Sequence, residues 1–318
     1  MIKVASAWMA PSGIFNSHLI QASAIERCGT AEQKEKFLPR MVTGELRGGV
    51  ALTEPNAGSD LQAIRTTAVK DGDDYIINGA KTWITNSLNG NSLLVLVKTD
   101  TDIKPRHKGT SLFVVETKDA DGNFLPGIEV IKMKKLGYKA IDTCEVVFTQ
   151  FRVSASNLVG GVEGKGFVQT VGGLELGRIN VAARGAGIGL GAMELAVRYA
   201  QEREAFGTPI CNHQAIQLKL GEMAAKVEAS RLLIEQAAAK YDAEERCDME
   251  AGMAKYFASE TGVFCASEAM RIFGGYSYSV EYDIERYYRD AMLMCIGEGT
   301  NEMQRIIIAK QLIEKYKI

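Results

Sequence analysis

Residues 64–77 read IRTTAVKDGDDYII, and this stretch decides how the middle of the chain folds. Within residues 64–69 the side chains alternate in character from one position to the next, which is the period-two pattern of a strand. Asp71 and Gly72 form a hairpin turn signal, and the β-prone run 75–77 follows it. The stretch therefore predicts two strands joined by a tight turn.

Short strands continue on the C-terminal side of this hairpin. Residues 93–97, 112–115 and 146–148 are rich in Val, Leu and Phe. The loops between them, 104–109 and 119–127, carry Gly, Asp, Lys and Pro. Several strands in a row without intervening helices predict a compact all-β unit.

Helical patterns flank this β unit on both sides. Residues 12–26 mix apolar and small side chains without strand alternation, and Thr30 and Gln33 mark a capping box whose helix is expected to end near Gly44. From residue 167 onward, apolar positions recur at helical spacing. Breaks in this pattern fall near residues 207–209, 246 and 274–275.

The predicted fold is α+β and multidomain. A short N-terminal helical segment occupies residues 1–47, a central antiparallel β-barrel-like domain occupies 48–160, and an antiparallel four-helix bundle occupies 161–318. A chain of 318 residues is long enough for two or three such structural units.

Charge and composition exclude several classes of partner and site. The formal net charge is −2 and the pI is about 6.1, so the chain has no general attraction to nucleic acid or to an anionic membrane. The six cysteines form no CxxC pair, and the three histidines lack zinc-ligand spacing, so no metal site is expected. The sequence shows no transmembrane-length apolar run and no signal peptide, and the cysteines are expected to be reduced thiols.

Two glycine-rich stretches imitate nucleotide-binding loops. Residues 185–191 (GAGIGLG) lie inside a helical pattern rather than between a strand and a helix, so they indicate close helix–helix packing. In residues 164–166 (GKG) no Ser or Thr follows the lysine, so this stretch is interpreted as a flexible entry to the first long helix.

Residues 52–60 (LTEPNAGSD) and 81–86 (KTWITN) form a more specific pair. Taken alone, the first string is a strand that runs into a polar turn. Together, the indole of Trp83 and nearby threonine hydroxyls at a strand end suit a planar ring system with polar edges.

These two strings resemble the flavin-binding motifs in the β domain of the acyl-CoA dehydrogenase family. The resemblance spans essentially the whole chain, with four motifs in family order. It implies FAD as the cofactor and Ser59 near the CoA portion of the substrate. The residues implied to contact the cofactor from these strings are Leu52, Thr53, Trp83, Ile84 and Thr85.

The string 202–207 (EREAFG) by itself indicates a solvated helix end with surface ion pairs. The resemblance implies that Arg203 binds the pyrophosphate of FAD held by a neighbouring subunit, and that Phe206 packs nearby. An arginine suits this role because its fork donates two charge-assisted hydrogen bonds. His213 and Gln214 follow at the expected positions and belong to the same implied cofactor set.

Residues 271–278 (RIFGGYSY) are similar to a glycine-rich family stretch near the same cofactor. Gly274 and Gly275 allow close backbone approach. Arg271 stands where a glutamine is usual and is expected to serve the pyrophosphate. Ser277 stands where a glycine is usual.

The last motif, residues 296–305 (IGEGTNEMQR), by itself indicates a glycine-flanked turn before the C-terminal helix, with Thr300 or Asn301 as the cap. The resemblance implies that Glu298 is the base that removes the α-proton of the substrate. Gly299 is implied to lie beside the substrate. The implied cofactor contacts from this segment are Thr300 and Glu302.

Some relatives carry their base on the first long bundle helix instead. The matching position here is Gly177, which cannot act as a base, so Glu298 is the family-consistent candidate. The adjacent Arg178 matches a position that contacts the CoA moiety, although an ordinary salt bridge within the bundle would also explain it.

The resemblance implies FAD-dependent α,β-dehydrogenation of an acyl-CoA thioester to the trans-2-enoyl-CoA, with hydride transfer to flavin N5, as in fatty acid β-oxidation. It implies an electron-transfer flavoprotein as the electron acceptor and a homotetramer built as a dimer of dimers. The expected compartment is the cytoplasm of a bacterium or the mitochondrial matrix. Because full-length members begin with a longer helical domain, residues 1–47 are interpreted as the remnant of that domain.

Three alternatives remain open. A related flavin oxidase or monooxygenase would react quickly with oxygen. A decarboxylating glutaryl-CoA enzyme needs a cation for the distal carboxylate, and residues 12–26 contain no Arg or Lys, which disfavours it. A non-catalytic nucleic-acid-binding relative is disfavoured by the acidic pI and by Glu298.

Overall fold

A computed structural model describes the backbone of residues 1–318 and every side chain except those at positions 171, 173 and 174. The chain divides into two compact units. The helical unit comprises Met1–Ser12, Lys135–Ala140 and Glu175–Ile318, and the sheet unit comprises Gly13–Lys134 and Ile141–Leu174.

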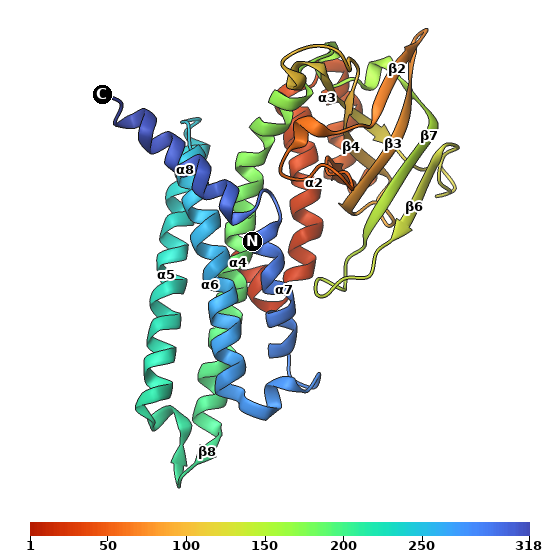
Figure 1. Cartoon of the computed structure of the whole chain (residues 1–318). Helices are drawn as coiled ribbons and strands as arrows, with labels where there is room; N and C mark the ends of the chain where they lie inside the picture. Colours follow the sequence, from red (N-terminus) through yellow and green to blue (C-terminus); the bar gives the residue numbers. More distant parts are fainter. The chain divides into compact units, whose positions relative to one another are not determined.

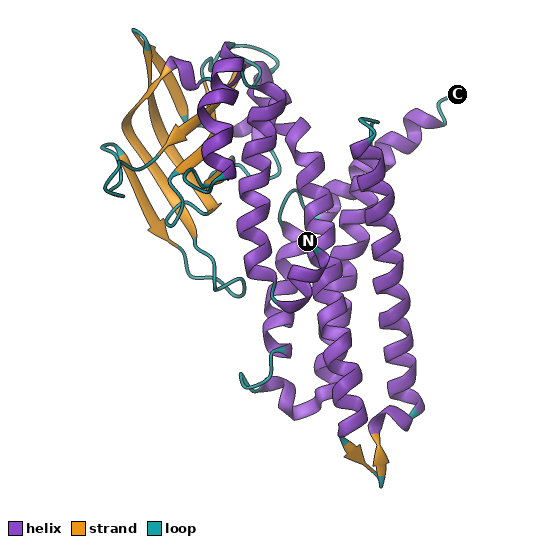
Figure 2. Cartoon of the chain, turned by 180° about the vertical axis from the view of Figure 1, so that it is seen from behind, coloured by secondary structure: helices purple, strands orange, loops and turns teal.

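Helices dominate both ends of the chain, and strands fill its middle (Figures 1 and 2). The α-helices are α1 (Ile2–Ala7), α2 (Met9–Cys28), α3 (Ala31–Val42), α4 (Gly166–Glu202), α5 (Gln214–Asp242), α6 (Asp248–Phe273), α7 (Ile284–Ile296) and α8 (Asn301–Lys315). The strands are β1 (Gly48–Ala51), β2 (Thr67–Asp71), β3 (Asp74–Thr85), β4 (Ser92–Lys98), β5 (Thr110–Glu116), β6 (Ile128–Lys132), β7 (Thr143–Ser154), β8 (Glu204–Ala205) and β9 (Thr208–Pro209).

The main sheet has seven strands in the order β1-β4-β2-β3-β7-β6, and β5 also pairs with β4. Four of these pairings are antiparallel, but β1 and β2 each run parallel to β4. The predicted wholly antiparallel arrangement is therefore corrected to a mixed sheet. Parallel neighbours need long connections, and both of these pairs are separated in sequence by other strands.

The predicted hairpin is confirmed as β2 and β3. Asp71 pairs with Asp74, and the intervening Gly72 has φ of 63°. Strand β2 begins three residues later than the alternating pattern suggests. The reason is that the Glu54 carboxylate accepts the backbone N–H groups of Arg65 and Thr66, which are then unavailable to a ladder.

Strand β4 is buried on both faces. Leu93, Val95 and Val97 belong to the core within the sheet, whereas Leu94 and Leu96 pack against residues of α2 and α3. A strand covered on both sides has no solvent face, which explains its continuous apolar sequence. The helix α3 is capped by Thr30 and Gln33, as the capping box predicts.

The predicted four-helix bundle is present as α4, α5, α6 and α7, with α8 packed on α6. The glycines of α4 permit close packing, as predicted. A Cβ added at Gly185 would lie 2.7 Å from the backbone oxygen of Ala258 on α6. No helix among the described residues is long and apolar enough to cross a membrane.

Candidate active site

In the sheet unit, the strings 52–60 and 81–86 are held together. The Lys81 ammonium donates to the backbone oxygen of Leu52 (3.1 Å) and to the Glu54 carboxylate (2.8 Å). The backbone N–H of Thr82 donates to the backbone oxygen of Thr53 (2.9 Å). The structure therefore brings the two predicted flavin strings side by side.

The ion pair between Lys81 and Glu54 is buried, with side-chain exposures of 0% and 6%. Burial alone would raise the pKa of the Glu54 carboxyl, but the charge and hydrogen bond of Lys81 hold that pKa below its ordinary value. Burial lowers the pKa of Lys81 to about 8, against the opposing charge of Glu54. Sequence reasoning missed this pair, although both residues stand inside the quoted strings.

Trp83 occupies a bulge in β3. The register between β3 and β7 shifts between Lys81 and Ile84, and Trp83 has φ of 63°, a left-handed conformation that strains a bulky residue by about 1–3 kcal/mol. Its indole is 57% exposed, while the Ile84 side chain lies in the sheet core. Of this string, the indole and the half-buried Thr85 are therefore the side chains open to a ligand.

Ser59 lies at the exposed end of the first string, just after a turn at residues 54–57. The turn is closed by mutual backbone hydrogen bonds between Glu54 and Ala57. Ser59 itself is exposed, and Leu52 and Thr53 are half-buried. The hydroxyl of Ser59 is therefore accessible to a ligand that approaches from solvent.

In the helical unit, a pocket of about 610 Å³ gathers several predicted cofactor residues. Arg203, Gly274 and Gly275 line it, together with the aromatic rings of Tyr199, Phe273 and Tyr276. The Arg203 guanidinium lies 5.8 Å from the Tyr276 ring centre. The pocket thus combines a cation, an exposed glycine turn and aromatic faces.

Beside this pocket, the β8–β9 turn presents Phe206 almost entirely to solvent, at 98% exposure. The His213 ring lies edge-on to the Phe206 ring, with 6.0 Å between the ring centres. Its Nε2 forms a hydrogen bond with the backbone oxygen of Ala205 (3.1 Å). Gln214 is exposed at the start of α5. The Phe206 ring is therefore accessible to a ligand or to another subunit.

Arg271 does not line the pocket. Its guanidinium donates to the Glu268 carboxylate (2.8 Å), which the Lys219 ammonium also contacts. Ser277 is compatible with the glycine turn, because its hydroxyl donates to the backbone oxygen of Gly274 (2.8 Å).

Glu298 sits in the turn between α7 and α8 and is half-buried. Its φ is 55°, a left-handed value, and that of the following Gly299 is 83°. The Gln304 amide donates to the backbone oxygens of both residues (3.3 and 3.2 Å), and Thr300 caps α8. Glu302 is exposed in the first turn of that helix. The backbone carrying Glu298 is therefore held in a strained conformation.

A buried lysine supports both sides of this turn. The Lys255 ammonium, from α6, donates to the backbone oxygen of Cys295 (3.2 Å) at the end of α7 and to the side-chain oxygen of Asn301 (2.8 Å) at the start of α8. Burial lowers the pKa of Lys255 to about 8, while the charges of Glu298 and Glu302 oppose that shift. Sequence reasoning missed Lys255, because nothing in its helical context marks it.

Burial raises the pKa of the Tyr138 phenol, the charge of Arg184 opposes this shift, and the charges of Asp290 and Glu298 reinforce it. Tyr138 is 5% exposed and adopts a φ of 57°, and its backbone N–H donates to the Asp290 carboxylate. The guanidinium of Arg184 lies 5.2 Å from its ring centre. No pattern in the sequence around Tyr138 or Arg184 predicts that these two residues lie together.

Arg178 is buried on α4, and its nearest carboxylate contact is Asp248 at 3.7 Å. This contact, made by Nη1, is too long for a hydrogen bond, and neither Nε nor Nη1 of Arg178 has a hydrogen-bond partner in the protein. The salt-bridge explanation therefore accounts for only part of its hydrogen-bonding capacity. The neighbouring Gly177 offers no side-chain base.

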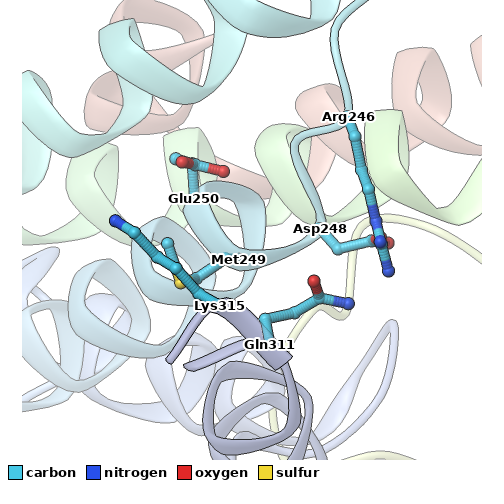
Figure 3. A pocket seen from close by; sticks show the side chains of 6 residues that line it. All are labelled: Arg246, Asp248, Met249, Glu250, Gln311 and Lys315. Atoms are coloured by element: carbon cyan, nitrogen blue, oxygen red, sulfur yellow. The ribbon is translucent and has the colours of Figure 1, made fainter. Parts of the chain in front are cut away.

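Another pocket, of about 130 Å³, lies between the start of α6 and α8 (Figure 3). Two of its charged side chains pair with each other, since the Arg246 guanidinium contacts Asp248 (3.0 Å), and Glu250 pairs with Lys240 outside the lining (2.5 Å). It contains none of the predicted site residues. Within the described residues, no group of three His, Cys, Asp or Glu side chains is placed to hold a metal ion.

Models of three protein domains match most of the chain. The model of the acyl-CoA dehydrogenase N-terminal domain matches residues 1–45, that of the middle domain matches 49–151, and that of the C-terminal domain matches 164–313. The matches follow the order of the sequence from one end to the other.

Individual proteins show the same similarity. The chain is 42% identical over 286 residues to an acyl-CoA dehydrogenase of Bacillus subtilis (90% of this chain, 73% of that protein). It is 41% identical over 310 residues to an acryloyl-CoA reductase (NADH) of Anaerotignum propionicum (96% of this chain, 76% of that protein). The solved structure of butyryl-CoA dehydrogenase from Megasphaera elsdenii superposes with a TM-score of 0.93 at 37% identity, covering 98% of this chain and 80% of that one.

Proposed function

Because the chain belongs to the acyl-CoA dehydrogenase family, we propose that it oxidises an acyl-CoA thioester between Cα and Cβ to the trans-2-enoyl-CoA, with Glu298 as the base. The family is one of FAD-dependent oxidoreductases, and solved relatives include one described with FAD.

The residues of each unit fit this cofactor. In the sheet unit, the exposed indole of Trp83 offers a flat apolar face beside the paired strings. In the helical unit, Arg203 and the Gly274–Gly275 turn line one pocket, which suits a pyrophosphate because arginine binds phosphate oxygens and the glycines leave room for a close approach. When bound, FAD supplies the acceptor for a hydride.

The proposed chemistry breaks two C–H bonds. The Glu298 carboxylate would take the proton from Cα, and the hydrogen on Cβ would leave with its electron pair as a hydride, for which bound FAD would supply the acceptor. The electron pair of the broken Cα–H bond then forms the Cα–Cβ double bond. The backbone N–H of Glu298 is proposed to donate to the thioester carbonyl, which stabilises the enolate-like charge as it develops.

The constrained position of Glu298 carries this proposal. The left-handed backbone of Glu298 lies in a turn held by Gln304 and Lys255, which fixes the point from which its side chain extends. Strained backbone is retained where the surrounding structure enforces it, and such positions cluster at functional sites. Gly177 leaves the other position used for a base in this family without a carboxylate.

Further site roles are proposed on the same basis. Ser59 and Arg178 are proposed to contact the CoA moiety, with Gly299 next to the acyl group. The accessible hydroxyl of Ser59 and the two Arg178 guanidinium nitrogens that lack a hydrogen bond support these roles. Thr300 and Glu302 are proposed to contact the FAD cofactor.

We also propose that the chain works as a homo-oligomer, a dimer of dimers, with an electron-transfer flavoprotein as its oxidant. The nearly fully exposed ring of Phe206, close in sequence to Arg203 of the pocket, supports a neighbouring subunit whose bound FAD reaches this region. Arg271, paired with Glu268, would have to leave that pair to reach the same cofactor.

The decisive experiment is the Glu298→Gln substitution in FAD-loaded protein. We expect the variant to retain its flavin spectrum but to show no bleaching of the flavin band after stopped-flow mixing with an acyl-CoA series. Glu314→Gln, at the exposed end of α8, is the matched control and should behave as wild type. Bleaching at the wild-type rate in Glu298→Gln would refute the assignment.

A second candidate, reduction of a 2-enoyl-CoA, is favoured by the similarity to an acryloyl-CoA reductase over 96% of the chain. The same residues would serve, with protonated Glu298 returning its proton to Cα. Pre-reduced enzyme mixed with acryloyl-CoA distinguishes the directions. Rapid return of the oxidised flavin band with acryloyl-CoA, combined with slow bleaching by propionyl-CoA, would favour the reductase.

A further inference from the structure

The amide of Gln304 packs against the turn that carries Glu298. Gln304 stands on α8, within the helical unit, and is 1% exposed. Its Nε2 donates to the backbone oxygen of Glu298 (3.3 Å) and to that of Gly299 (3.2 Å). On the other side lies α6, since a Cβ added at Gly252 would be 3.7 Å from Gln304 Oε1. The amide is therefore enclosed between α6 and the turn.

Only the donor half of this amide is bonded. A glutamine amide carries two hydrogens on its nitrogen, which match the two consecutive carbonyl oxygens of Glu298 and Gly299. Within the described part of the chain, Oε1 of Gln304 is buried and has no hydrogen-bond partner. Leaving a buried acceptor unpaired is costly, and the reversed amide would bring Oε1 against two other acceptors. The bonds to the turn therefore fix the orientation of the amide.

The same two bonds fix the backbone on the C-terminal side of Glu298. Each of them holds the plane of one trans peptide unit, the unit after Glu298 and the unit after Gly299. These residues have φ of 55° and 83°, and a left-handed glutamate persists only where contacts enforce it. On the N-terminal side, the Gly297 N–H donates to the backbone oxygen of Leu293 (2.9 Å) at the end of α7. The direction of the Cα–Cβ bond of Glu298 is thus set from both sides.

Gln304 acts more directly on Glu298 than Lys255 does. Lys255 binds the helices on either side of the turn, through Cys295 and Asn301. Gln304 binds the backbone oxygen of Glu298 itself. It therefore acts on the residue that carries the carboxylate.

We infer that Gln304 is a positioning residue for proton transfer, because its two amide hydrogens hold Glu298 in the left-handed conformation that directs the carboxylate at the α-carbon of the substrate. This inference rests on the proposed dehydrogenase function and adds a residue to its machinery. The role is indirect, since Gln304 acts through the backbone of Glu298 and not on the substrate. Without both donors, Glu298 would relax toward a right-handed or extended backbone that points its carboxylate elsewhere.

The first test uses FAD-loaded wild type and Gln304→Met, which keeps the length of the side chain and removes both donors. Propionyl-, butyryl- and hexanoyl-CoA are compared, and the one that bleaches the wild-type flavin fastest is used throughout. We expect Gln304→Met to bleach about 10- to 100-fold more slowly at saturating substrate with little change in KM, because a small misplacement of a reacting group slows its step without weakening binding. The ratio of flavin to protein absorbance should equal that of wild type.

Deuterated substrates distinguish misplacement of the base from a loss of folded protein. With deuterium at Cα, the ratio of undeuterated to deuterated bleaching rates should be larger in Gln304→Met than in wild type, because proton removal limits the rate more strongly. With deuterium at Cβ, the ratio should not rise. A smaller population of folded enzyme would lower all rates together and leave both ratios unchanged.

Proton transfer is also followed without net turnover. In the absence of an electron acceptor, the α-deuteron passes to the Glu298 carboxylate, exchanges with water, and a proton returns to Cα. Mass spectrometry of the recovered acyl-CoA measures this exchange, which should be slower in Gln304→Met by a similar factor. Gln311→Met, at a half-buried position about two turns further along α8, is the matched control and should exchange as wild type does.

The inference and the proposed function fail in different ways. Wild-type rates and isotope ratios in Gln304→Met, with Glu298→Gln inactive, would overturn the positioning role alone. Bleaching and exchange at wild-type rates in Glu298→Gln would refute the base, and the inference with it. If Gln304→Met fails to fold, Gln304→Asn decides, because it keeps the amide but withdraws it by one methylene group. It is expected to raise the Cα isotope ratio, and a wild-type ratio would overturn the inference.

Discussion

The Nζ of Lys255 lies 2.8 Å from the side-chain oxygen of Asn301, so a fully buried lysine on α6 binds the first residue of α8. The same ammonium binds the last turn of α7 through Cys295. Glu298 lies between these two attachment points. The conformation of the proposed catalytic turn is therefore set partly by a helix distant from it in sequence.

Lys255→Met is expected to loosen this turn. It removes the ammonium donor from the backbone oxygen of Cys295, at a cost of about 1–3 kcal/mol, while the side-chain oxygen of Asn301 keeps the hydroxyl of Ser259 as a donor (3.0 Å). We expect a lower free energy of unfolding in urea and a lower kcat with a smaller change in KM, because the turn would hold Glu298 less firmly. A variant that loses stability but keeps wild-type kcat would show that Lys255 supports the fold alone.

The wild-type protein should also carry a pH signature of Lys255. Burial lowers its pKa to about 8 from an ordinary value of 10.5, so between these pH values the unfolded chain binds more protons than the folded one. Its contribution to stability therefore rises as pH increases from about 8 to 10.5 and is lost as pH falls back through that window. The difference in unfolding free energy between wild type and Lys255→Met should widen over this range; parallel curves would contradict the prediction.

The buried pair of Lys81 and Glu54 should behave non-additively. Lys81→Met leaves a buried carboxylate uncompensated and is expected to cost about 3–5 kcal/mol. Glu54→Gln leaves the opposite charge unpaired, whereas the double variant removes both charges. In a urea-based double-mutant cycle the double variant should lose less stability than the sum of the single losses. Additive losses would mean that the two charges do not interact.

Trp83→Ala is expected to weaken FAD binding with little loss of stability. Its indole is more than half exposed, so few core contacts are lost, and alanine tolerates the bulge backbone no worse than tryptophan. The ratio of flavin to protein absorbance after dialysis measures retention of FAD. Trp8→Ala replaces the other tryptophan, which is 40% exposed, and should retain FAD as wild type does.

Gly185→Ala is expected to destabilise the helical unit by about 1–3 kcal/mol, because the new methyl group would meet the backbone of α6. Gly221→Ala in α5 is the matched control. A Cβ at Gly221 would meet nothing within 4 Å, so this change should stabilise its helix by about 0.5–1 kcal/mol. Thermal unfolding of both variants checks the opposite signs.

Local sequence patterns predicted the elements of the fold well, because they depend on neighbours in the chain. The hairpin at Gly72, the capping box at Thr30 and the glycine-mediated packing of α4 follow from backbone freedom, side-chain capping and small volume. Local patterns did not predict that β1 and β2 run parallel to β4, because the relative direction of two strands depends on connections that span many residues.

The sequence by itself determined the family motifs, the order of helices and strands, and the choice of Glu298 over Gly177 as the proposed base. Only the tertiary structure paired Lys81 with Glu54, placed Lys255 across the Glu298 turn and stacked Arg184 on Tyr138. Each of these contacts joins residues on separate elements, and a buried charge has no periodic pattern that reveals its partner. The partners of Lys81, Lys255 and Arg184 are therefore decided by burial and by contacts between distant residues, which arise only when the chain packs.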